Sequence, residues 1–177
     1  ELEKLMPEIL KWCEQVLYPI GKKYGFDQLV IDWTTDARSK DRHSKTINIL
    51  DASSLIGNAR LIKDDHEISL IRIACDISAE AHIEAMKNVK DADSEQDIES
   101  LYIHEFSKNG GRFQAYTPIV ASGENACVLH YTENNKKFNK KDLLLVDAGC
   151  EYEMYASDIT RTFPISGKFS KEQLEIY

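Results

Sequence analysis

The sequence LLLVDAGCEYEMYASDITRTFP, residues 143–164, places Asp147 and Asp158 in segments that otherwise have the pattern of buried β-strands. A carboxylate that follows four consecutive apolar residues is costly to remove from water unless a cation meets it. A metal ion is the simplest single partner for two such groups. The pair therefore predicts half of a metal site.

Adjacent antiparallel strands would bring Asp147 and Asp158 within reach of one ion, because the residues between them are few enough for a hairpin. Oxygen ligands suit hard cations such as Mn²⁺ or Mg²⁺, and two metal ions about 3.5–4 Å apart polarise a carbonyl group and generate hydroxide. A simpler interpretation stays open on these residues alone. In it, Asp147 caps a turn with Gly149, and Asp158 pairs with Arg161.

His130 lies among apolar and aromatic neighbours in the segment 128–131, where a neutral imidazole can orient a substrate or donate to a developing charge. A single histidine in a strand is also explained as a hydrogen-bonded core residue. Ser122 has no nucleophile-elbow context, and the one-glycine loop 122–125 is weak evidence for phosphate binding, so nucleophilic catalysis is disfavoured. The other histidines show no ligand spacing and are expected to be structural or solvated: His43, His66, His82 and His104.

The composition is that of a soluble globular protein, since 42% of the 177 residues are hydrophobic and 29% are charged. A net charge of −8 without a basic stripe argues against a nucleic-acid surface. No apolar run approaches the roughly 18 residues of a membrane span, and the N-terminus lacks the features of a signal peptide. The cysteines are far apart and form no CxxC pair, which predicts reduced thiols in a cytoplasmic protein: Cys13, Cys75, Cys127 and Cys150.

Capping boxes predict three helices. They are expected at 65–87, from 95 to the glycine pair 110–111, and from about 171, after the boxes Asp64/Glu67, Ser94/Asp97 and Ser170/Gln173. Apolar segments bounded by Gly, Asn and Lys predict strands at 117–121, 127–131, 143–149 and 154–163. Two helices followed by an antiparallel sheet indicate the α+β class.

The first part of the chain has weaker signals. Helical spacing of apolar residues predicts a helix over 1–25, and a short strand is expected at 28–33. The polar segment 34–46 is either a domain boundary or a surface loop, and 47–62 is a mixed connector. The last predicted helix is cut short at Tyr177, which predicts that the chain is a fragment of a longer protein.

Three segments together resemble the bacterial aminopeptidase P family, the Xaa-Pro aminopeptidases among the pita-bread metallopeptidases. They are VASGENACVLHYTEN at 120–134, VDAGCEY at 146–152 and YASDITRTFPISGKF at 155–169. The resemblance covers about residues 58–177. It implies that 51–177 is the first half of a pita-bread catalytic domain, with two helices packed on an antiparallel sheet. Residues 1–50 are then the end of an α/β N-terminal domain and a linker.

The resemblance also implies roles for individual residues. In the family, the aspartate of the Asp-Ala-Gly element binds one metal ion and that of the Ser-Asp-Ile-Thr element bridges both, which assigns these roles to Asp147 and Asp158. The histidine of Leu-His-Tyr lines the substrate pocket near the scissile bond, so His130 takes a catalytic and substrate-binding role. Tyr116 matches a pocket tyrosine. The remaining ligands, one histidine and two glutamates, lie beyond Tyr177, so this chain holds two of five.

The implied activity is that of a metallo-aminopeptidase that removes the N-terminal residue from peptides with proline in second position, through hydroxide bound by two Mn²⁺ ions or other divalent ions. Proline offers a tertiary amide without N–H, so its recognition relies on ring shape and histidine contacts. The implied partners are peptides with N-terminal Xaa-Pro and, when full length, further copies of the protein in a homo-oligomer. No nucleic acid or membrane is expected to bind, and the isolated fragment is expected to be inactive.

Two alternatives stay open. A prolidase, which takes only Xaa-Pro dipeptides, shares the same metal ligands, although the Leu-His-Tyr and Cys-Glu-Tyr elements look more like aminopeptidase P. A non-catalytic pita-bread module binds peptides or proteins without cleaving them. Such modules usually lose the metal aspartates, so retention of Asp147 and Asp158 favours an enzyme.

Overall fold

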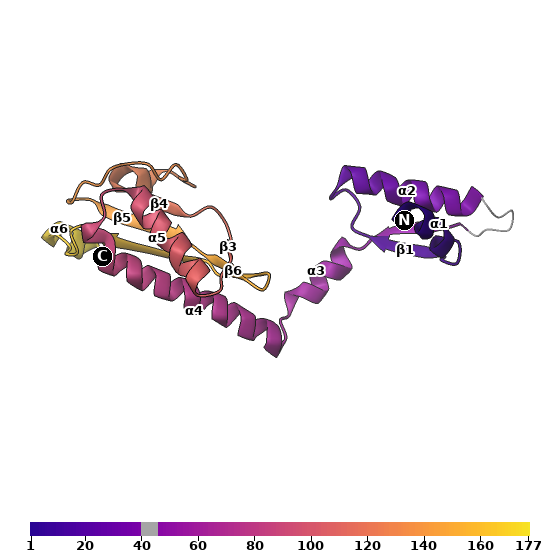
Figure 1. The fold of residues 1–177 in the computed structure, drawn as a ribbon, viewed down its shortest axis with the longest axis horizontal. Coiled ribbons are helices and arrows are strands. Elements are labelled where there is room, and N and C mark those ends of the chain that lie inside the picture. Colours follow the sequence, from indigo (N-terminus) through magenta and orange to yellow (C-terminus); the bar gives the residue numbers. More distant parts are fainter. Residues whose placement is uncertain (40–45) are drawn as a thin grey trace. The chain divides into compact units, whose positions relative to one another are not determined.

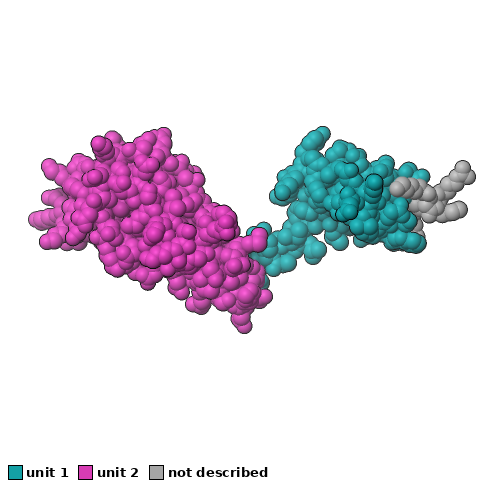
Figure 2. Space-filling model, viewed as in Figure 1, with its two compact units in different colours: residues 1–63 teal, residues 64–177 magenta. Residues whose placement is uncertain are grey.

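The computed structural model describes residues 1–39 and 46–177, which form two compact units, Glu1–Lys63 and Asp64–Tyr177 (Figure 2). The segment expected to be a boundary or loop at 34–46 is helical as far as Ser39, and His43 lies outside the described residues. The division between the units falls after residue 63. The assignment of 1–50 and 51–177 to separate domains of a longer protein stays a prediction.

Unit 1 is a small α/β unit whose two strands pair in parallel. Its elements are α1 (Leu2–Leu10), β1 (Gln15–Tyr18), α2 (Tyr24–Ser39), β2 (Asn48–Asp51) and α3 (Ser53–Leu61). The helix predicted over 1–25 is confirmed only as far as Leu10, and the strand predicted over 28–33 is wrong because those residues belong to α2. Val30, Trp33 and Ala37 follow one face of α2 and bury it, whereas Val16 belongs to β1 and pairs with Ile49.

Unit 2 begins with two helices and continues into short strands, as the sequence predicts. Its elements are α4 (Asp65–Asn88), η1 (Val89–Asp91), α5 (Glu95–Lys108), β3 (Phe113–Gln114), β4 (Ile119–Ser122), η2 (Gly123–Cys127), β5 (Leu143–Ala148), β6 (Cys150–Tyr152), β7 (Tyr155–Ala156), β8 (Ile159–Pro164) and α6 (Lys171–Ile176). All three predicted capping boxes are present, at the starts of α4, α5 and α6.

The strands of unit 2 form two antiparallel sheets of three strands, ordered β4-β5-β8 and β3-β6-β7. The α+β class is therefore confirmed. The single strand predicted over 154–163 is wrong, because β7 and β8 belong to different sheets. The chain changes sheet where Gly149 packs against Ser157: a Cβ at Gly149 would lie 1.8 Å from the Ser157 carbonyl oxygen, so only glycine fits there.

The core of unit 2 lies between the sheets and the pair α4 and α5, which pack against each other and against strands of both sheets (Figure 1). Side chains alternate along β5, so Leu144, Val146 and Ala148 are fully buried in this core. The intervening residues Leu143, Leu145 and Asp147 are only half-buried on the opposite face. That face carries the candidate site.

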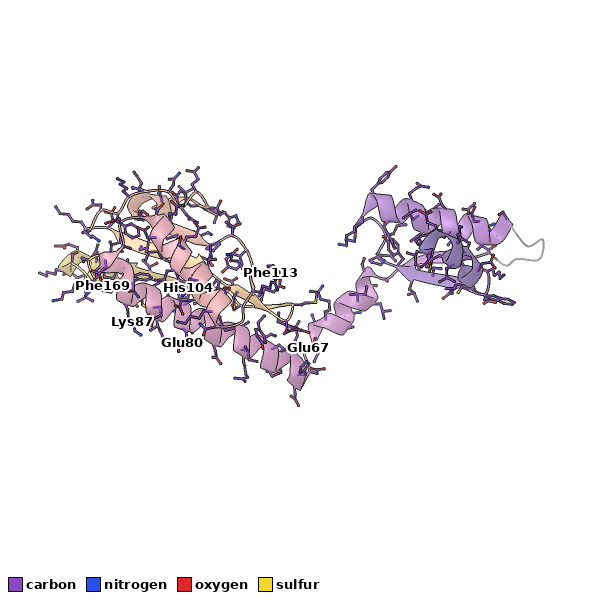
Figure 3. All side chains as sticks on the ribbon, in the orientation of Figure 1. Glu67, Glu80, Lys87, His104, Phe113 and Phe169 are labelled. Atoms are coloured by element: carbon purple, nitrogen blue, oxygen red, sulfur yellow. The ribbon has the colours of Figure 1, made fainter. Side chains whose placement is uncertain are left out.

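Buried and surface polar groups join these elements. The Tyr155 hydroxyl donates to Glu67 Oε1 at 2.6 Å, which connects β7 to the first turn of α4, where Figure 3 labels Glu67. Glu80 and Lys87, also labelled there, are exposed along α4.

In the described part of the chain, no helix has the length and apolar character that a bilayer span needs. All the cysteines are free thiols.

Candidate active site

Two carboxylates from different strands meet at one hydroxyl group. Asp147 lies near the end of β5, and Asp158 directly precedes β8, where the register pairs Ala148 with Ile159. The Tyr116 hydroxyl lies 2.5 Å from Asp147 Oδ1 and 2.8 Å from Asp158 Oδ1. The antiparallel pairing therefore brings the two aspartates together, although they are joined through the separate β6–β7 hairpin.

The structure does not contain the simpler arrangement, in which Asp147 caps a turn with Gly149 and Asp158 pairs with Arg161. No ion pair joins Asp158 to Arg161 among the described residues, and the Arg161 guanidinium donates instead to the Thr160 carbonyl at 2.8 Å. Asp147 belongs to the β-ladder rather than to a turn. Neither carboxylate is thus explained by a purely local partner.

A cavity of about 370 Å³ opens at these carboxylates, and all four residues predicted for the site line it. Its walls are Tyr116, Thr117, Ile119, His130, Thr132, Asp147 and Asp158. Within residues 1–39 and 46–177, no cluster of three or more His, Cys, Asp or Glu side chains could hold a metal ion. Asp147 and Asp158 are accordingly the only strong anionic donors that line this cavity.

The donor set at the pocket fits a divalent cation. Burial, together with the hydrogen bonds to Asp147 and Asp158, raises the pKa of Tyr116 far above its ordinary value, so this phenol stays protonated. One hydroxyl proton cannot satisfy two carboxylates, which leaves excess negative charge on hard oxygen atoms. Mn²⁺, Mg²⁺ and Zn²⁺ all accept such ligands.

His130 does not lie in a strand, so the strand predicted over 127–131 is wrong. The chain leaves η2 at Cys127 and turns, and His130 adopts a left-handed backbone with φ of 55°. A left-handed residue cannot continue a β-ladder. The imidazole is exposed at the pocket wall, so the interpretation of His130 as a core residue is also wrong.

The core histidine of unit 2 is His82, which is 2% exposed on α4. Its Nδ1 lies 2.6 Å from the Tyr102 hydroxyl, and its Nε2 lies 3.0 Å from the Ile159 carbonyl oxygen. Because a carbonyl only accepts, Nε2 carries the proton and Nδ1 accepts from Tyr102. The structural role expected for His82 is thus what the structure shows, next to the start of β8.

Sequence reasoning missed two buried polar residues that hold the loop carrying His130. Glu95 and Asn134 are 0% and 2% exposed, and both bind backbone groups of this part of the chain. The only sequence signal for Glu95 was an acidic residue in the first turn of a helix, which the helix dipole already explains. Asn134 had no signal apart from its place in the resembling segment 120–134.

A second cavity of about 320 Å³ adjoins the first and shares Ile119, His130 and Asp147 with it. Its other lining residues are Ala126, Cys127, Val128, Leu129, Leu145 and Thr160. Most of these side chains are apolar. An apolar group placed there would therefore lie beside His130 and Asp147.

Comparison with known proteins agrees with this geometry. The model of metallopeptidase family M24 matches residues 69–177, and the chain belongs to this family. The Xaa-Pro aminopeptidase of Haemophilus influenzae is 52% identical over 129 residues, which cover 73% of this chain and 30% of that protein. The resemblance to aminopeptidase P and the pita-bread fold are thereby confirmed.

Two solved structures of Escherichia coli aminopeptidase P superpose on nearly the whole chain. A variant in complex with substrate has a TM-score of 0.94 at 37% identity, covering 99% of this chain and 40% of that one. The zinc-substituted protein in complex with product has a TM-score of 0.93, also at 37% identity, with the same 99% and 40% coverage. The present chain therefore spans less than half the length of these relatives.

Proposed function

We propose that this chain is part of a metal-dependent Xaa-Pro aminopeptidase, which removes the N-terminal residue from peptides longer than two residues that carry proline in second position. The observation that carries the proposal is the convergence of Asp147 and Asp158 on the Tyr116 hydroxyl, in a pocket that His130 also lines. The similarity to Xaa-Pro aminopeptidases supports the substrate class.

Asp147 and Asp158 would hold divalent ions, with the remaining ligands supplied by parts of the whole protein outside this chain. When bound, a dinuclear Mn²⁺ centre would activate water and neutralise the negative charge that develops on the scissile carbonyl. Hard carboxylate oxygens support this assignment. A zinc-substituted relative supports the use of other divalent ions as well.

The residues of this chain bind and orient the peptide. The free α-amino group of the substrate would bind near the acidic metal ligands, which in this chain are Asp147 and Asp158. His130, at the wall of the first cavity, contacts the substrate near the scissile bond and can donate to its carbonyl oxygen. The apolar side chains of the adjoining cavity suit a proline ring, which has no N–H to pair.

The two alternative functions are those of a prolidase and of a non-catalytic peptide-binding module. A prolidase would take only the Xaa-Pro dipeptide, and a non-catalytic module would bind peptides without cleavage. The retention of both Asp147 and Asp158, side by side at the Tyr116 hydroxyl, disfavours the second, because non-catalytic modules of this fold usually lose the metal aspartates. Chain length of the substrate separates the first from an aminopeptidase.

The test is a peptide assay on the whole protein. We expect Arg-Pro-Pro to be cleaved, Gly-Pro to be a poor substrate, chelation to abolish the cleavage and returned Mn²⁺ to restore it. Cleavage of Gly-Pro alone would identify a prolidase. Cleavage of neither peptide, with metal bound, would identify a binding module.

We also propose a cytoplasmic, homo-oligomeric protein that binds neither nucleic acid nor membranes. The free thiols support a reducing compartment, and the net charge of −8 supports the lack of nucleic-acid binding. Cell fractionation and the mass of the native particle measure the location and the oligomeric state.

A further inference from the structure

Glu95 is a fully buried carboxylate that the peptidase chemistry described above does not use. It is the first residue of α5 and accepts five hydrogen bonds, all from residues of the segment 122–136. Oε1 accepts from the Ser122 amide and hydroxyl, both at 2.8 Å, and from Asn125 Nδ2 at 3.0 Å. Oε2 accepts from the Tyr131 hydroxyl at 2.8 Å and the Lys136 amide at 2.9 Å.

The geometry requires the charged form of Glu95. Burial acts to raise its pKa, but the hydrogen bonds from Lys136, Ser122 and Asn125 outweigh burial and hold the pKa below its usual value. Burial, and to a lesser extent the hydrogen bond with the Glu95 carboxylate, raises the pKa of Tyr131 to about 12. The Tyr131 hydroxyl therefore keeps its proton and donates to Glu95. A neutral amide in place of the carboxylate would direct N–H groups at some of these donors.

The segment that Glu95 binds carries His130 in a conformation that needs support. The left-handed backbone of His130, with φ of 55°, is unfavourable for a residue with a side chain. Val128 and Leu129, just before it, are 55% and 85% exposed and contribute little packing. The hydrogen bond from the hydroxyl of Tyr131, the next residue, to Glu95 is therefore the nearest buried contact that fixes the His130 backbone.

Asn134 fastens the same segment from another direction. Its Oδ1 accepts from the Val120 amide at 2.9 Å, and its Nδ2 donates to the Pro118 carbonyl at 2.8 Å and to Glu99 at 2.9 Å. The segment 122–136 is thus tied at both ends to α5 and β4. Between these ties, Glu95 contacts residues both before and after His130.

We propose that Glu95 is a positioning residue, which acts through the segment 122–136 to hold the His130 imidazole at the substrate pocket. The inference rests on the proposed function in one respect, because the position of His130 affects turnover only if His130 contacts the peptide. The holding of the segment itself does not depend on any activity.

The first experiment measures the segment directly, by hydrogen exchange in the whole metal-loaded protein. Glu95→Gln keeps the side-chain volume and removes the charge, and we expect the amides of 123–136 to exchange about tenfold faster or more, as for the loss of a hydrogen bond to a charged group. The amides of β5 and β8 should be unchanged. Glu105→Gln is the matched control, since Glu105 lies on the same helix and contacts Lys108 instead.

The second experiment asks whether the effect on turnover passes through His130, by a double-mutant cycle on the cleavage of Arg-Pro-Pro. We expect Glu95→Gln to lower kcat/KM by about tenfold or more in the wild-type background and by less than about twofold in His130→Ala. Metal content should be equal in all variants. A residue that only stabilises the fold would lower activity equally in both backgrounds.

Tyr131→Phe covers the case in which Glu95→Gln does not fold. It removes one donor beside His130 and keeps the ring, so a smaller rise in exchange and the same dependence on His130 are expected. Unchanged exchange in 123–136, or equal losses in both backgrounds, would overturn the proposal. A wild-type protein that cleaves no Xaa-Pro peptide would overturn the proposed function instead, while the exchange comparison would still decide whether Glu95 holds the segment.

Discussion

Tyr116 shows how much of the site is decided by single atoms. Its hydroxyl oxygen lies within hydrogen-bond distance of two carboxylates but has one proton to donate. The raised pKa of Tyr116 means that this proton is retained rather than lost. The phenol therefore orients Asp147 and Asp158 without cancelling their charge, and this residual charge is what a divalent ion would neutralise.

Replacing Asp158 by asparagine tests this charge balance in the whole protein. Asp158→Asn keeps the shape of the side chain and should abolish peptidase activity, because bound cations would lose a compensating charge and at least one should dissociate. We expect a fall in activity beyond the roughly 10–100-fold that loss of an outer-shell partner costs. Metal analysis and the Arg-Pro-Pro assay measure the two effects.

The matched control for this change is Asp76→Asn, at an exposed position on α4, which should retain metal and activity. The circular dichroism spectrum of Asp158→Asn should match that of the wild type, since Asp158 lies outside the core. Two bound metal ions and normal turnover in Asp158→Asn would remove the metal-binding role from this residue.

At the scale of elements, side chains alternate along β5 between the core face and the site face. Leu144, Val146 and Ala148 point into the packed core, so Asp147 must point to the other face. Pairing with β8 then places Asp158 beside it. The position of the carboxylate pair follows from the pleat of one strand and the register of its neighbour.

Local signals decide which elements could be predicted from the sequence. Helices α4, α5 and α6 begin with capping boxes, which are local signals that can be read within four residues of the sequence. Unit 1 was mispredicted because β1 is a four-residue strand whose partner lies beyond α2, and no local pattern shows such a pairing.

The site was predictable where its residues lie in or directly beside regular strands and not where they lie in a loop. Asp147 follows the apolar run 143–146 and Asp158 directly precedes β8, but the turn at His130 depends on a distant glutamate. Glu95 occupies a helix start, where an acidic residue is unremarkable in sequence. Its role appears only when five donors from the segment 122–136 are seen around it.

His82 connects α4 to β8 and makes this connection sensitive to pH. Burial above all, with a further contribution from Arg161, lowers the pKa of His82 in the folded state. The unfolded chain, with a histidine pKa near 6.5, then binds a proton that the folded protein does not. The stabilisation is complete above about pH 6.5 and is lost as the pH falls from there toward the lower folded-state pKa.

Hydrogen-exchange protection of buried α4 amides, corrected for the intrinsic pH dependence of exchange, measures this effect in the whole protein. The opening free energy should fall by up to about 1.4 kcal/mol per pH unit over that window. His82→Gln should flatten the profile, whereas His104→Gln should not, because His104 is exposed on α5 (Figure 3). An unchanged profile in His82→Gln would assign the acid sensitivity to another group.

At the scale of the whole molecule, the relevant feature is the face of unit 2 that carries Asp147 and Asp158, which the described residues leave partly exposed. Leu143 and Leu145 remain half-buried on the site face of β5, and a cavity of about 420 Å³ lies between Leu143 and the C-terminal residues Phe169, Ile176 and Tyr177. This chain covers 40% of the solved relatives that it matches. The face that bears the carboxylates is therefore one that this chain does not cover by itself.

The 177-residue chain alone should consequently be inactive and should bind Mn²⁺ only weakly. Two carboxylates cannot complete the roughly six-coordinate shell that hard cations prefer, so we expect a dissociation constant above roughly 10⁻⁴ M. Calorimetric titration with Mn²⁺, on a sample whose mass is verified as 20.2 kDa, measures this, with Asp158→Asn in the same chain as the blank. Micromolar binding or cleavage of Arg-Pro-Pro by that species would mean that the site is completed in another way, for instance by ligands from a second copy of the chain.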